Sequence, residues 1–159
     1  MRNKVTKKTY ERLSNQLRQL QHELVTVIIP EVAVAREHSN NEENDQLIHA
    51  KQNQQNFESR IISLTRLIDN TDVVTNVTFN GTAGYGMLVK LENDENGDVK
   101  TYRIVGEMET TESNDVSIKS PMGLAIVGSQ IGDSVEIKKP SGPQFWTILD
   151  IVVDPNFNN

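Results

Sequence analysis

The sequence contains no cysteine, and this absence narrows the kinds of site it can hold. Disulfides and thiolate-bound zinc are excluded, and the three histidines show no metal-ligand spacing. Aromatic residues are scarce at 5%, and hydrophobic residues make up only 36% of the 159 positions. Both values are low for one compact globule. They favour a chain in which part of the length is an extended element with much exposed surface.

Long hydrophobic runs are also lacking. No segment approaches the roughly 18 apolar residues of a membrane span, and no apolar segment of a signal peptide follows the basic N-terminus. We therefore expect a cytoplasmic protein without a membrane partner.

Positive charge is scarce beyond residue 75, where there are six bases and twelve acids, whereas residues 1–38 carry seven bases and four acids. This distribution argues against a general DNA-binding protein.

Two long segments have apolar residues at alternating spacings of three and four, which is typical of helices that pack against each other. The first series consists of Leu13, Leu17, Leu20, Leu24 and Val27 and resumes at Val34. The second consists of Leu47, Ala50, Gln54, Phe57, Ile61, Leu64 and Ile68, with Gln54 as its single polar member. Two such series joined by a short polar segment predict an antiparallel αα-hairpin.

Local signals set the expected limits of the two helices. Thr6 is a suitable N-cap for a helix that begins at Lys7, and His38 would end that helix. Pro30 lacks a backbone donor and predicts a kink within it. Residues 69–72 would end the second helix.

An acidic, polar run separates the two series: Ser39-Asn40-Asn41-Glu42-Glu43-Asn44-Asp45-Gln46. In a hairpin this run would form the tip, far from any core. A solvated turn whose charges stay out of a core would have the same composition. The position of the charges at the far end favours contact with a partner.

From about residue 75 the pattern changes to short β-rich runs separated by turns. The predicted strands are Val73–Phe79, Met87–Leu91, Val99–Val105, Val116–Lys119, Ser134–Lys139 and Gln144–Val153. Most of them should pair as hairpins. Ser120 and Pro121 have the chemistry of a helix cap and first helical residue, so Pro121–Val127 is predicted to be the one helix that crosses the sheet.

Several short motifs occur along the chain in a specific order and spacing. They are Pro30-Glu31, Ala35-Arg36-Glu37-His38, Glu43-Asn44, Arg60-Ile61, Thr101-Tyr102-Arg103-Ile104-Val105-Gly106, Ser120-Pro121, the Leu124 to Gly128 run, and Pro140 with Gly142. Together they resemble the motifs of the bacterial Gre factors, a family of transcription elongation factors. The resemblance covers nearly the whole chain. It implies an α+β protein with an N-terminal antiparallel coiled-coil hairpin, residues 1–74, followed by a C-terminal FKBP-like β-rich domain, residues 75–159.

The resemblance also implies a function. Such a factor is expected to be a monomer that inserts its hairpin into the secondary channel of bacterial RNA polymerase and stimulates cleavage of backtracked RNA. It is expected not to be an enzyme itself and to bind no cofactor alone. Instead Glu43 would help hold the second Mg²⁺ of the polymerase active site, near the nascent RNA 3′ end, since Mg²⁺ prefers hard oxygen ligands.

The tip departs from the family pattern at one functional position. Where the family has a Gly-Asp step, this sequence reads Ser39-Asn40, so the first tip acid is an amide. Glu42 and Asp45 lie close enough to compensate. An aromatic residue expected near Leu47 is also missing. The alternative is therefore a regulator that occupies the channel without promoting cleavage.

Four further residues receive roles from the resemblance. Arg36 and Lys51 correspond to basic residues that guide the RNA 3′ end through phosphate contacts, although each could be an ordinary flank of a coiled coil. Ser120 and Pro121 match the segment that docks on the rim helices of the largest polymerase subunit.

A third hypothesis, a prolyl isomerase or chaperone, has support only from the expected FKBP-like fold, which is weak ground for a function.

Overall fold

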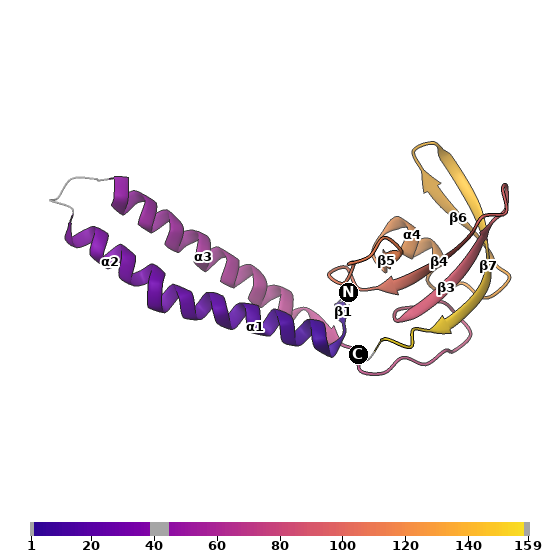
Figure 1. Cartoon of the computed structure of the whole chain (residues 1–159), viewed down its shortest axis with the longest axis horizontal. Helices are drawn as coiled ribbons and strands as arrows, with labels where there is room; N and C mark the ends of the chain where they lie inside the picture. The colour runs from indigo at the N-terminus through magenta and orange to yellow at the C-terminus, as the bar shows by residue number, and fades with distance from the viewer. Residues whose placement is uncertain (1, 39–44, 158–159) are drawn as a thin grey trace. The chain divides into compact units, whose positions relative to one another are not determined.

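The computed structural model describes residues 2–38 and 45–157. The chain forms two compact units (Figure 1). One contains Tyr10–Thr71, and the other contains Met1–Thr9 together with Asp72–Asn159. We refer to them as the hairpin unit and the C-terminal unit, and each is described by itself.

The hairpin unit consists of helices that run out and fold back (Figure 1). Its outgoing arm contains α1 (Lys7–Glu23), the π-helix η1 (Leu24–Ile28) and α2 (Ile29–Glu37), and its returning arm is α3 (Asp45–Asp69). The Thr9 N–H donates a hydrogen bond to the Thr6 hydroxyl oxygen at 3.2 Å, as expected for an N-cap. The predicted antiparallel αα-hairpin is confirmed.

The irregularity predicted at Pro30 takes the form of η1, which lies just before the proline. The Ile29 N–H bonds to the carbonyl of Leu24, five residues back, instead of the usual four. A proline ring clashes with the carbonyl four residues earlier in a regular α-helix. The wider turn relieves that clash, and the helix continues through Pro30 into α2.

The π-helix shifts the buried seam of the outgoing arm by one residue. The sequence predicted that Val27 and Val34 would face the other helix, but they are 43% and 53% exposed. Ile28 and Ala35 are buried in their place, at 4% and 9% exposure. One extra residue in a helical turn rotates all following side chains about the helix axis. A prediction that continues the spacing of three and four beyond η1 therefore selects residues on the wrong face of the helix.

The seam of α3 follows the prediction. All seven expected positions, including the polar Gln54, are half-buried in the structure. None of the residues of α3 is fully buried. The returning arm is therefore held by partial contacts, and most of its residues are exposed.

The C-terminal unit is built on a five-stranded sheet with the order β5-β4-β3-β7-β6. Its strands are β3 (Met87–Asn93), β4 (Val99–Val105), β5 (Asp115–Ser117), β6 (Ser134–Lys139) and β7 (Gly142–Val153). The pairing of β4 with β5 is parallel, and the other three pairings are antiparallel. Helix α4 (Pro121–Ile126) links β5 to β6, the two edge strands, so the predicted crossing helix is confirmed.

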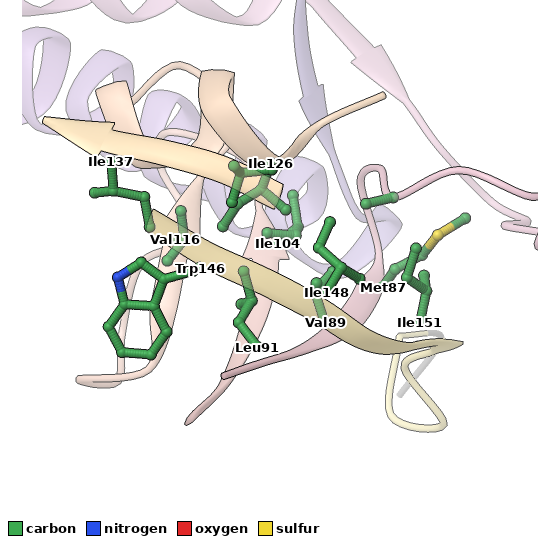
Figure 2. Packing of buried hydrophobic residues seen from close by; sticks show 12 residues of the cluster. Met87, Val89, Leu91, Ile104, Val116, Ile126, Ile137, Trp146, Ile148 and Ile151 are labelled. Atoms are coloured by element: carbon green, nitrogen blue, oxygen red, sulfur yellow. The ribbon is translucent and has the colours of Figure 1, made fainter. Parts of the chain in front are cut away.

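The core of this unit gathers side chains from the sheet and α4 (Figure 2). In β3 the buried residues Met87, Val89 and Leu91 alternate with more exposed ones, which is the pattern of a strand with one face on a core. Ile126 from α4 and Trp146 from β7 are buried in the same cluster. The α+β fold class is confirmed.

The predicted strand Val73–Phe79 is wrong in most of its length. The strand β2 covers only Thr71–Val73 and pairs with β1 (Asn3–Val5), a strand that the sequence did not predict. A run of β-branched residues needs a partner strand, and β1 is only three residues long. The chain after Val74 therefore continues without a ladder.

The two compact units divide the chain differently from the two predicted domains, whose boundary stays a prediction. The sequence assigned all of residues 1–74 to the hairpin, whereas Met1–Thr9 and Asp72–Val74 belong to the C-terminal unit. The cause is the β1–β2 pair, together with hydrogen bonds from Thr6 and Thr9 to Glu109.

Candidate functional site

The predicted tip lies between the end of α2 and the start of α3. Three of its four expected acting residues, Asn40, Glu42 and Glu43, lie outside the described residues. The fourth, Asp45, is the first residue of α3 and is exposed. A carboxylate at this position interacts favourably with the partial positive charge of a helix N-terminus. Asp45 therefore has a local role in addition to the predicted one.

The two predicted RNA-guiding residues lie near these helix ends. Arg36 is in the last turn of α2 and exposed, where its charge also complements the helix C-terminus. Lys51 is exposed on α3, six residues after Asp45, which corresponds to about 9 Å along the helix. Each cation is thus within two turns of the tip. Contact with RNA stays a prediction for both.

A groove on the hairpin unit was not predicted from the sequence. It has a volume of about 800 Å³ and is bordered by residues of the outgoing arm and of α3. Its lining includes Val27, Pro30, Val34, His38, His49 and Ala50. The two valines are left exposed here because η1 turned them away from the seam. Pro30, in the middle of an otherwise regular series, was the one signal that could have suggested this surface.

The predicted docking residues lie at the start of α4. The Ser120 hydroxyl oxygen accepts a hydrogen bond from the Gly123 N–H at 3.0 Å, and the hydroxyl donates to the Ser117 carbonyl at 2.7 Å. Pro121 is the first residue of the helix and is exposed. The prediction of a helix cap is confirmed. The docking role stays a prediction.

Gly123 fixes how closely this helix approaches the sheet. A Cβ atom at this position would overlap the carbonyl oxygen of Ser117, next to the end of β5. The close approach leaves two apolar side chains of this segment on the surface, Leu124 at 65% and Val127 at 41% exposure. Their spacing of three places them on a similar face of the turn. They extend the surface that Pro121 begins, and no sequence motif had indicated this.

Among residues 2–38 and 45–157 there is no group of three or more histidine, aspartate or glutamate side chains placed to hold a metal ion. Mg²⁺ is commonly held in proteins by only one or two carboxylates, with water and substrate oxygens completing its shell. The exposed carboxylate of Asp45 has the chemistry of such a ligand. Whether it holds Mg²⁺ shared with a partner stays a prediction. None of the described helices is long and apolar enough to cross a membrane.

Comparison with known families accounts for both parts of the chain. Residues 3–73 match the family model described as transcription elongation factor, N-terminal. Residues 78–152 match the model described as transcription elongation factor, GreA/GreB, C-term. The chain belongs to the GreA/GreB family of transcription elongation factors.

Individual relatives match along most of their length. A protein of Jannaschia sp. (strain CCS1) named transcription elongation factor GreA is 36% identical over 148 residues, covering 92% of this chain and 95% of the relative. A protein of the same name from Ruegeria pomeroyi is 34% identical over the same share of each chain. The match therefore spans both units.

Solved structures with similarity include the GreA factor homolog 1 (Gfh1) protein of Thermus thermophilus. It is 27% identical, covers 96% of this chain and 99% of that chain, and gives a TM-score of 0.43. The prokaryotic transcription elongation factor GreA/GreB from Nitrosomonas europaea is 16% identical with a TM-score of 0.43. The family assignment rests on the sequence matches.

Proposed function

We propose that this elongation factor binds bacterial RNA polymerase through its secondary channel and stimulates cleavage of backtracked nascent RNA. The observation that carries the proposal is the acidic run at the turn of a two-helix hairpin in a chain of the GreA/GreB family. The hairpin is narrow, with a seam of partial contacts and no buried residue in α3. A narrow element with charged residues at its end is suited to entering a channel.

In this proposal the chain supplies ligands and leaves the cutting to the polymerase. Mg²⁺ shared with the polymerase would neutralise charge on the reacting phosphate and lower the pKa of a water molecule. Glu43 would provide a hard oxygen ligand. Asn40 offers an amide oxygen without charge, and Glu42 or Asp45 would supply the charge that it lacks.

The basic residues near the tip would position the substrate. Arg36 and Lys51 would bind phosphates of the displaced RNA 3′ segment and hold it near the tip. Phosphate contacts carry no sequence information, so release of RNA should depend little on its sequence.

The C-terminal unit would dock the factor at the channel entrance. Ser120 and Pro121 would contact the rim helices of the largest subunit, and the exposed Leu124 and Val127 would add apolar area to that contact. In this proposal the factor acts as a monomeric accessory protein, and the polymerase performs the cleavage.

A non-cleaving regulator of the same channel is the second candidate, and one residue favours it. Asn40 replaces an acid that the family uses, and an amide contributes no charge to metal binding. Such a protein would bind the polymerase in the same way and slow synthesis without releasing RNA.

The test is a cleavage assay on backtracked elongation complexes with labelled RNA. The native chain should release short 3′ fragments, Glu43→Ala should reduce the rate at least about tenfold, as loss of one metal ligand implies, and Asn40→Asp should raise it. Glu136→Gln, which changes an exposed carboxylate of β6, should leave the rate unchanged. Binding without fragments, with cleavage restored by Asn40→Asp, would establish the second candidate instead.

A further inference from the structure

The carboxylate of Glu109 joins segments of the C-terminal unit that are far apart in the sequence. Its Oε2 accepts hydrogen bonds from the Thr6 N–H and hydroxyl, both at 3.1 Å, and from the Thr9 hydroxyl at 2.7 Å. Its Oε1 accepts from the Tyr85 hydroxyl and from the Gly106 N–H at 3.3 Å. An ionised carboxylate has about four acceptor positions, so Glu109 is saturated with donors.

Tyr85 is held as one of these donors. Its side chain is 8% exposed, and its ring makes an edge contact with Phe157, with centroids 5.4 Å apart. Burial, and then the hydrogen bond to Glu109, raise the pKa of Tyr85. The hydroxyl therefore stays protonated and can donate at any physiological pH.

Two further features hold the segment that carries Thr6. A Cβ atom on Gly106, the residue after β4, would overlap the carbonyl oxygen of Lys4. Only glycine therefore permits β1 to lie so close to the end of β4. Val5 is fully buried, and the Lys119 ammonium donates to the side-chain oxygen of Asn3. Residues 3–9 are thus held by hydrogen bonds to Glu109, by close packing around Val5 and Gly106, and by the hydrogen bond from Lys119.

We infer that Glu109 is a positioning residue that clamps residues 3–9, including the first turn of α1, onto the C-terminal unit. Its loss should free this segment and leave the five-stranded sheet folded. The sheet has its own cluster of twelve buried residues, and neither Val5 nor Tyr85 belongs to it. The β1–β2 pair has only two short strands, and such a pair is marginally stable without added contacts.

The residues that Glu109 binds are continuous in sequence with the hairpin unit. Helix α1 begins in the C-terminal unit at Lys7 and continues into the hairpin unit from Tyr10. The residues that Glu109 binds therefore form the root of the arm that leads to the tip.

Amide hydrogen exchange of the full-length chain, followed by NMR, tests the clamp without polymerase. In Glu109→Ala, we expect the Thr6 and Val74 amides to exchange at least about tenfold faster, equivalent to about 1.4 kcal/mol of local opening free energy. The amides of Val89 and Ile148 in the sheet should change less than twofold. Glu112→Ala, an exposed carboxylate three residues away, is the matched control and should change none of them.

Two results would overturn the inference. An equal rise at all four amides would make Glu109 a general stabiliser of the unit, and no rise at Thr6 and Val74 would remove its clamping role. Tyr85→Phe keeps the packing of the ring and deletes one donor, so it should give the same pattern with a smaller rise. If Glu109→Ala does not fold, the exchange rates of Tyr85→Phe provide the test of the inference. Because the measurement uses the protein alone, its failure is distinct from a failure of the cleavage assay.

Discussion

The apolar side chains of the five-stranded sheet are buried more deeply than those of helix α3 in the hairpin unit. In the C-terminal unit Val89, Leu91 and Ile104 have no exposed surface, and strands from distant parts of the sequence surround them. In the hairpin unit no residue of α3 is fully buried. The comparison suggests a division of tasks. The sheet supplies a stable base, while α3 leaves most of its residues exposed and free for contacts.

Unfolding of the two units can be followed with separate signals. Trp146 is the only tryptophan, and it is 3% exposed in the core of the C-terminal unit. Its fluorescence reports on that unit, whereas far-ultraviolet circular dichroism reports mainly on the long helices. Two-state unfolding cannot be assumed for a chain with two units, so both signals are needed.

The largest loss of stability is expected from Leu91→Ala. This side chain is fully buried, and its truncation should lower the free energy of unfolding of the C-terminal unit by about 2–5 kcal/mol. Urea titration monitored by Trp146 fluorescence measures the change. Leu124→Ala is the control, because a side chain that is 65% exposed should cost less than about 0.5 kcal/mol. Similar losses for both variants would contradict the assigned core.

The shifted seam of the hairpin predicts a difference between two neighbouring residues. Ile28→Ala should lower the stability of the hairpin by about 2 kcal/mol, because Ile28 is 4% exposed. Val27→Ala, at 43% exposure, should cost less than about 0.5 kcal/mol. Circular dichroism in urea measures both. A larger loss of stability for Val27→Ala than for Ile28→Ala would support the seam expected from the sequence and would contradict the shift caused by the π-helix.

The C-terminal unit should also show a pH dependence that originates at Asp115. Two hydrogen bonds from the Arg103 guanidinium, supported by the Thr111 and Glu112 N–H groups, hold the pKa of Asp115 at about 2. Because the folded pKa lies below the usual value, this stabilisation is complete above about pH 4 and is lost as the pH falls toward 2. The loss should be about 2 kcal/mol.

The measurement is the urea midpoint of Trp146 fluorescence between pH 5 and about pH 2. Asp115→Asn should be less stable near pH 5 and should have a flatter profile, because it no longer titrates. If the urea midpoint of Asp115→Asn changes with pH as steeply as that of the native chain, another carboxylate is responsible for the pH dependence.

The smallest effect, and the one of opposite sign, is expected in the α3 seam. Gln54 is half-buried among apolar seam residues, and its amide bonds to Glu58 at 3.0 Å. Gln54→Leu should stabilise the hairpin by about 1 kcal/mol, since about half a leucine side chain becomes buried. Gln52→Leu lies on the exposed face and should change the stability little. Equal effects would show that the seam does not pass through Gln54.

Regular patterns made much of the fold predictable from the sequence. The strands Val99–Val105 and Ser134–Lys139 have the predicted bounds, and the α3 seam follows its spacing. The prediction failed where one local feature changed the pattern. Near Pro30 the π-helix rotated the seam, and at Val73–Phe79 there was no partner strand for a run with strong β propensity.

Less of the candidate site and of the Glu109 contacts could be predicted, because only local motifs leave a signal in the sequence. The Ser120 cap is a local motif and was found. The contact of Thr6 and Thr9 with Glu109 spans about a hundred residues, and no periodicity links them. The tip roles of Asn40 and Glu43 rest on the family, and they stay predictions until a complex with polymerase is measured.

Cross-linking in a backtracked elongation complex tests the central claim most directly. A photoreactive residue at position 46, at the tip end of α3, should cross-link to the 3′ segment of the nascent RNA, whereas one at position 19, in α1, should not. Gln46 and Gln19 are both exposed, so the two probes are matched. Cross-links to RNA from position 46 alone are the predicted result. No RNA cross-link from position 46, or equal cross-links from both positions, would contradict the proposal that the hairpin delivers its tip to the polymerase active site.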